Sequence, residues 1–237
     1  MATRAPLQQS LRPITELTTA MELGQVFRDI FQHYRALYEK AGLIHGDIRL
    51  NNLRYCKKDR KNRGILIDLD ENDKTRPIFT QKTGSYMALD LLAPRLRPPC
   101  HFYRFDLESL FYVMLAVSCH YHNGKKVAHP PLETWQHLST QLYLEKYFFM
   151  HKGPVPIPTP NFGKFMALNV ELHAMFADGY DAQSKDIRMR FRPTYESAFD
   201  PETLGGHLTF DAFQRILDKH LPLLTFLVVS KYPSQQL

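Results

Sequence analysis

The sequence predicts a mainly α-helical fold with one small β-hairpin. Two long segments have the apolar pattern of helices: residues 20–41 along one face, and residues 106–117 all the way round. Between them, residues 53–67 have the pattern of two short strands joined by a charged turn. The chain has 237 residues, of which 44% are hydrophobic and 23% charged, so it can bury a core without disulfides or a structural metal.

The composition also limits the class of protein. Three cysteines cannot all pair in disulfides, which favours a reducing, intracellular compartment, cytoplasmic or nuclear. No apolar run is long enough to cross a membrane, and the first 13 residues lack the apolar core of a secretory signal, so we expect no membrane partner. The net charge of +6 is compatible with an acidic partner, phosphate or nucleic acid, and does not choose among them.

The first half of the chain contains the clearest local signals. Residues 1–17 are expected to be an irregular leader that precedes the first helix. Thr19 and Glu22 have the spacing of a capping box, and Gly42 stands where a left-handed residue ends a helix. These signals predict a helix over residues 20–41, followed by a polar loop that leads into the hairpin.

The hairpin itself is predicted from two short strands, residues 53–55 and 64–67. The seven residues 57–63 carry five basic side chains and are expected to form a solvated turn. No aromatic platform for stacking bases accompanies them, so we expect no nucleic-acid partner.

The second half is predicted to be helical around a buried post. Apolar side chains surround the helix over residues 106–117, which is typical of a helix at the centre of a fold. Further helices are expected near residues 131–149, 162–176 and 209–220. Residues 152–160 hold four prolines and are expected to be a loop. Cys119, His120 and His122 lack a paired Cys-x-x-Cys framework, so no metal site is expected there.

Three polar residues around the hairpin form the candidate site. Asp47 and Asn52 lie five residues apart in one loop, and Asp68 directly follows the second strand. An isolated Asp-x-x-x-x-Asn more often caps a turn. Phosphoryl transfer, however, needs one carboxylate to accept a hydroxyl proton, and an amide oxygen with a second carboxylate to hold magnesium. Because the hairpin folds back on itself, we expect Asp68 to lie close to Asn52.

Several segments resemble motifs of protein kinases, in the same order and at similar intervals. Residues 45–52 (HGDIRLNN) resemble the catalytic loop, 68–70 (DLD) the metal-binding segment, 83–90 (TGSYMALD) the end of the activation segment, and 104–112 (RFDLESLFY) the buried central helix. Three further runs are similar to the fungal-type protein kinase family: residues 34–42 (YRALYEKAG), 67–70 (IDLD) and 203–206 (TLGG).

This resemblance implies the fold and the site of a kinase large C-terminal lobe. It implies that Asp47 is the catalytic base, and that Asn52 and Asp68 bind magnesium and ATP. His45 would pack and form hydrogen bonds near Asp68. From its position and chemistry, we expect the guanidinium of Arg49 to meet the transferring phosphate.

Two structural carboxylates are implied by the same resemblance. Asp106 would accept hydrogen bonds from the backbone of the catalytic loop. Asp90 takes the place of the glutamate that pairs with a distant arginine in kinases, and Arg192 is expected to be its partner. Gly46 replaces the arginine of the catalytic loop, so control by phosphorylation of Thr80, Thr83 or Ser85 is not expected.

The expected domain organisation is a leader over residues 1–19, a kinase-like C-terminal lobe over 20–230, and a tail over 231–237. Only 44 residues precede His45, and they contain no glycine-rich loop and no strand lysine. We therefore expect the ATP-binding small lobe to be missing. Half of the nucleotide clamp would then be absent, so we expect weak binding of ATP and magnesium and little or no turnover by this chain alone.

Two alternatives remain open at this point. The chain can be a pseudokinase, a non-catalytic module that offers the lobe as a docking surface to a protein partner. It can also be a small-molecule phosphotransferase of the aminoglycoside or choline type, which the sequence His45-Gly46-Asp47 favours. The sequence does not predict a substrate, a named partner or an oligomeric state.

Overall fold

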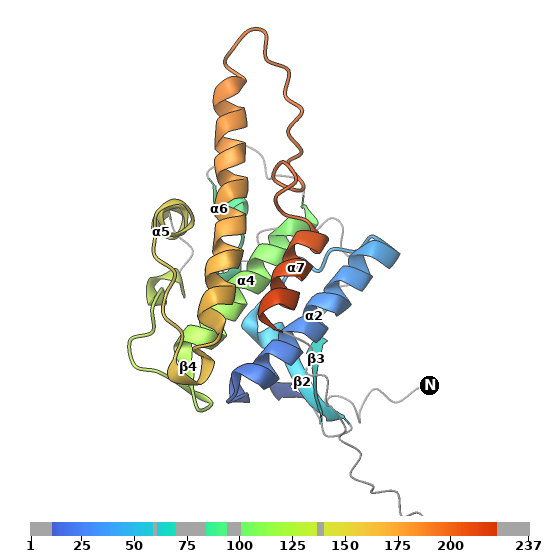
Figure 1. The fold of residues 1–237 in the computed structure, drawn as a ribbon, viewed down its shortest axis with the longest axis vertical. Coiled ribbons are helices and arrows are strands. Elements are labelled where there is room, and N and C mark those ends of the chain that lie inside the picture. Colours follow the sequence, from blue (N-terminus) through green and yellow to red (C-terminus); the bar gives the residue numbers. More distant parts are fainter. Residues whose placement is uncertain (1–10, 59–60, 70–83, 94–100, 137–139, 222–237) are drawn as a thin grey trace, which may run out of the picture.

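A computed structural model describes residues 11–58, 61–69, 84–93, 101–136 and 140–221 of the chain. Asp70, Thr80, Thr83, Cys100, the first ten residues of the leader and the expected tail lie outside the described residues. The described part is mainly helical with two small antiparallel sheets, which confirms the predicted balance of secondary structure. Figure 1 shows helix α4 (Tyr103–His120) running through the middle, with α2 (Ala20–Ala41), α6 (Phe165–Met189) and α7 (Phe210–His220) around it.

The remaining elements are short. Within the described ranges, the other helices are α3 (Leu89–Leu92) and α5 (Thr140–His151), and the 3-10 turns are η1 (Ile14–Glu16), η2 (Leu50–Asn52), η3 (Gly84–Tyr86), η4 (Glu133–Gln136) and η5 (Pro160–Phe162). The strands are β1 (Arg12–Pro13), β2 (Leu53–Lys58), β3 (Lys61–Leu66), β4 (Tyr121–His122) and β5 (Lys125–Lys126). Among the described residues, no helix is both long enough and apolar enough to cross a membrane.

Helix α2 begins and ends where its capping signals predict. The Thr19 hydroxyl accepts a hydrogen bond from the Glu22 backbone N–H at 3.2 Å. Gly42 adopts a left-handed conformation (φ 63°) and donates its N–H to the Tyr38 carbonyl at 2.8 Å. Both ends of the helix are therefore satisfied locally, and the apolar face packs into the main core.

The hairpin is confirmed, but its strands are longer than expected. Strands β2 and β3 pair in register from Leu53 with Leu66 to Lys58 with Lys61, so the charged residues belong to the ladder. Their side chains are mostly exposed, which lets the backbone pair at no desolvation cost. The leader is not wholly irregular, because Arg12 pairs with Tyr55 and adds β1 as a third strand.

Helix α4 forms the predicted buried post. Every residue from Tyr103 to Cys119 is buried, including the charged side chains of Arg104, Asp106 and Glu108. The helix is three residues longer at each end than the apolar pattern indicates. These three charged side chains form hydrogen bonds with backbone groups of neighbouring segments.

Three further expectations need correction. The segment near residues 131–149 is not one helix, because it forms η4 and then α5, with residues 137–139 outside the described part. Helix α6 continues 13 residues beyond the predicted end at Phe176 and projects past the other helices (Figure 1). A second hairpin, β4–β5, was missed although Asn123-Gly124 is a strong turn signal; both residues have positive φ, 50° and 75°.

The close contact between the hairpin and α2 gives a first prediction. A Cβ at Gly64 would lie 2.2 Å from the Val26 carbonyl oxygen, so Gly64→Ala must push β3 off the helix. We expect a loss of about 1–3 kcal/mol in the free energy of unfolding, measured by urea denaturation. The matched control is Gly163→Ala, where φ is −51° and the nearest atom would be 3.8 Å away. The two substitutions having the same effect would contradict this account.

Candidate active site

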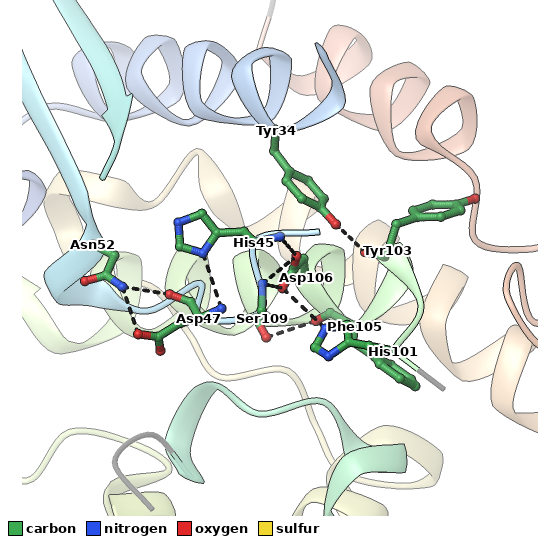
Figure 2. Close-up of polar contacts among 10 residues, drawn as sticks. Tyr34, His45, Asp47, Asn52, His101, Tyr103, Phe105, Asp106 and Ser109 are labelled. Atoms are coloured by element: carbon green, nitrogen blue, oxygen red, sulfur yellow. Dashed lines mark hydrogen bonds and ion pairs between the residues drawn. The ribbon is translucent and has the colours of Figure 1, made fainter. Parts of the chain in front are cut away.

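The loop that carries Asp47 is held by one carboxylate of the buried post. Asp106 accepts the backbone N–H of His45 at 2.9 Å and that of Gly46 at 3.1 Å (Figure 2). Gly46 has a φ of 74°, a left-handed conformation that favours glycine and turns the chain sharply before Asp47. The contacts expected of Asp106 from the resemblance are thus present in the structure.

His45 connects this loop to the end of the hairpin. Its Nε2 lies 3.0 Å from the Ile67 carbonyl oxygen, and its Nδ1 lies 3.3 Å from the Asp47 backbone nitrogen. These partners assign the proton to Nε2, since Nδ1 must accept from an N–H. The Ile67 N–H also donates to the Asn52 carbonyl at 2.9 Å. Ile67 therefore contacts both ends of the loop.

Asp68 follows Ile67 directly and is placed at the same end of the hairpin. Its φ of 60° is left-handed, which is uncommon for a residue other than glycine. Its side chain is exposed, in contrast to the buried Asn52. The residue before it, Ile67, donates its N–H to the Asn52 carbonyl, so Asp68 is one residue away from a backbone contact with the loop.

Asp47 and Asn52 contact each other directly. The Asn52 side-chain nitrogen donates to the Asp47 backbone carbonyl at 2.9 Å and to Oδ2 of its carboxylate at 3.0 Å. Both amide hydrogens are used in this way, so the amide oxygen is turned away from Asp47 (Figure 2). Partial burial raises the pKa of Asp47, while Arg49, Asn52 and His45 act in the opposite direction by favouring the carboxylate.

Arg49 lies against the proposed base. Its Nε is 3.1 Å from Asp47 Oδ2, an ion pair that lacks the angle of a hydrogen bond. The same carboxylate oxygen therefore faces both a guanidinium and the Asn52 amide. The sequence predicts that the Arg49 guanidinium meets a transferring phosphate, and in the structure the guanidinium forms an ion pair with the Asp47 carboxylate.

Residues 84–92 form the wall opposite this loop. A small cavity of about 20 Å³ lies between them; it is lined by Gly46, Asp47, Ile48, Tyr86, Met87, Leu91, His101, Phe105, Asp106 and Ser109. A cavity of this volume can hold about one water molecule. Asp47 and the segment 84–92 are thus neighbours across a narrow gap whose floor is α4.

The expected partner of Asp90 is wrong. Asp90 forms a buried ion pair with Arg104 of α4 and accepts a hydrogen bond from Gln183 at 3.1 Å. Arg192 is exposed in the segment after α6. Arg104 is the partner because it lies in the first turn of α4, next to the segment 84–92. Its Nε also donates a hydrogen bond to the Pro201 carbonyl at 2.8 Å, which holds the guanidinium in this position.

His101 was not identified from the sequence as a site residue. It lines the same cavity, its Nε2 is 3.9 Å from Asp106 Oδ1, and its ring packs edge-on against Phe105. Burial lowers the pKa of His101, which favours the neutral ring. No sequence signal marks it, because its position depends on the packing of α4.

The chemistry of the donor set fits a magnesium ion. Mg²⁺ prefers oxygen ligands and usually takes one or two from the protein, with the rest from phosphate and water. The amide oxygen of the buried Asn52, which is turned away from Asp47, and the exposed carboxylate of Asp68 are ligands of this kind. Among the described residues, no group of three or more His, Cys, Asp or Glu side chains that could hold a metal is present.

Comparison with known proteins adds one finding. The model of the family described as fungal protein kinase matches residues 1–118 of this chain. The matched stretch contains the loop with Asp47 and Asn52, the hairpin, Asp68 and most of α4. Searches of curated proteins and of solved structures gave no match.

The contacts of Asp106 generate the second prediction. Asp106→Ala leaves the N–H groups of His45 and Gly46 without their acceptor, at a cost of about 1–3 kcal/mol for each group. Asp211→Ala, in the first turn of α7, is the matched control; its side chain is 69% exposed and its pair with Arg35 is worth at most about 1 kcal/mol. Thermal denaturation compares the two, and equal losses would show that Asp106 does not hold the loop.

Proposed function

We propose that the loop and hairpin form a protein-kinase-type phosphotransferase site, because the fungal protein kinase model matches residues 1–118, the stretch that contains them. The reaction is transfer of the terminal phosphoryl group of ATP to a Ser or Thr hydroxyl of a protein. We also propose that residues 20–230 form the large C-terminal lobe of such a kinase. The observation that supports this most strongly is the contact of Asn52 with Asp47, in a loop held by Asp106.

Asp47 is the proposed catalytic base. Burial raises the pKa of Asp47, and Arg49 and Asn52 oppose that rise by favouring the carboxylate, which is the form that accepts a proton from an incoming hydroxyl. Asp47 lines the same small cavity as Tyr86 and Met87, so a hydroxyl bound there would lie between the carboxylate and the segment 84–92. His45 and Asp106 act on the reaction only by fixing the backbone on which Asp47 stands.

Asn52 and Asp68 would hold magnesium. When bound, the ion supplies positive charge that offsets the charge on the phosphate oxygens. The guanidinium of Arg49 would be a second cation beside the magnesium ion, since a guanidinium can bind two phosphate oxygens in parallel. To do so it must exchange its contact with Asp47 for one with the phosphate, which would also release the base.

The contact between Arg49 and Asp47 also favours a second candidate function. With the base already paired, the chain can serve as a non-catalytic module that binds a partner through this lobe. The two candidates differ in one respect that can be measured: only the first transfers phosphate.

The third prediction tests the reaction. The full chain is incubated with labelled ATP, MgCl₂ and a library of Ser- and Thr-containing peptides, and incorporation of label is measured. We expect slow, magnesium-dependent transfer that falls by about a hundredfold or more in Asp47→Asn, because the general base is lost. Asp211→Asn, an exposed carboxylate on α7, should keep the full rate.

Separate reactions offer an aminoglycoside and choline in place of the peptides. Transfer to these acceptors and not to the peptides would show that the substrate is a small molecule. Binding of magnesium and ATP in calorimetry, without transfer to any acceptor, would favour the non-catalytic module. Equal transfer by the native chain and by Asp47→Asn would contradict the role of Asp47.

A further inference from the structure

Two fully buried residues of opposite charge lie behind the segment 84–92. Glu108 of α4 and Lys146 of α5 are both 0% exposed. Each binds the backbone of the segment: the Leu89 N–H donates to Glu108 Oε1 at 2.8 Å, and the Lys146 ammonium donates to the Met87 carbonyl at 2.6 Å. The segment is thus held from two helices by two charged groups, at positions two residues apart.

The surroundings of both groups are built for charge. Glu108 accepts two further hydrogen bonds, from the hydroxyl of Tyr112 at 2.7 Å and from that of Tyr180 at 2.6 Å. The Lys146 nitrogen lies over two aromatic rings, 4.0 Å from the centre of Tyr112 and 4.9 Å from that of Trp135. Tyr112 therefore contacts both members and joins them into one cluster.

Burying such a cluster costs desolvation free energy that an apolar core does not cost. Burial raises the pKa of Glu108 and lowers that of Lys146, because it disfavours the charged form of each; their mutual attraction acts the other way on Lys146. Buried ion pairs are often no better for stability than apolar residues of the same size. What apolar residues cannot supply here is a donor for the Met87 carbonyl and an acceptor for the Leu89 N–H.

The segment held in this way is one wall of the candidate site. Met87 and Leu91 line the small cavity on the side opposite Asp47, so the positions of these two residues set its width. At the position of the catalytic-loop arginine of kinases this chain has Gly46, which offers no cation to a phosphate on the segment.

We propose that Glu108 and Lys146 are positioning residues that fix the segment 84–92 opposite Asp47 by buried charge, in place of a phosphate on that segment. This inference rests on the proposed function for the role of the cavity as the entry of a hydroxyl acceptor. The contacts themselves predict a site whose acceptor wall is permanently in place.

The fourth prediction is tested by amide hydrogen exchange on the full chain, with readouts over residues 84–92 and over α2. In Lys146→Met, which keeps the length of the side chain, and in Glu108→Gln, we expect exchange in the segment to be about tenfold faster, with α2 unchanged. The controls are Lys219→Met and Glu171→Gln, which remove an exposed pair of the same two residue types on other helices. These controls should leave exchange in the segment as it is.

A milder variant covers the case in which neither substitution folds. Tyr112→Phe removes one hydrogen bond to Glu108 and keeps the ring under Lys146, so we expect a smaller increase, about threefold, confined to the segment. Exchange that is unchanged in every folded variant, or that rises equally in α2 and the segment, would overturn the proposal.

Hydrogen exchange needs no substrate, so it is independent of the proposed reaction. If the segment loosens as expected and no phosphate is transferred, the positioning stands and the reaction fails. Where transfer is measurable, Tyr112→Phe should raise the KM for the acceptor peptide and leave the KM for ATP unchanged, a split that a general loss of stability would not produce.

Discussion

The carboxylate of Asp106 is the interaction on which the candidate site depends. It stands on a helix that is buried on every side, and it accepts the backbone N–H groups of the two residues before Asp47. A loop with no regular structure of its own is thereby tied to a helix in the middle of the core. Asn52 then holds Asp47 from the other end of the same loop, so the base is fixed from both sides.

The features that could be predicted from the sequence have local causes. Thr19 caps the start of α2 through Glu22, and Gly42 caps its end through Tyr38. Each contact joins residues only three or four positions apart, so both ends of the helix can be predicted from local sequence. The second half of α6 is different, because its residues have no apolar period. It is stabilised by distant contacts: Tyr180 donates to Glu108, and Asp186 accepts from Tyr195 and Ser197. Such contacts exist only once the fold has formed.

The same distinction explains which site residues the sequence identified. Asp47 and Asn52 could be paired from the sequence because they lie five residues apart in one loop, and their contact is present. Asp68 was proposed because it follows a returning strand, and its neighbour Ile67 contacts His45 and Asn52 of that loop. The partner of Asp90 was not predicted, because a pair between two buried side chains depends on which arginine the packing brings near. Glu108 and Lys146 belong to the same class, since they lie on two different helices and come together only in the folded core, around Tyr112 and the segment that they hold.

Asp106 and Glu108 show how one helix can serve two loops. Residues two apart on a helix point about 200° from each other, so these carboxylates leave α4 in different directions. Asp106 binds the loop of the base, and Glu108 binds the segment that faces it. Because both walls of the cavity are tied to the same buried helix, the gap between them depends on the geometry of α4. Moving either wall alone must therefore break a buried hydrogen bond to a carboxylate of α4, which leaves a polar backbone group without its partner.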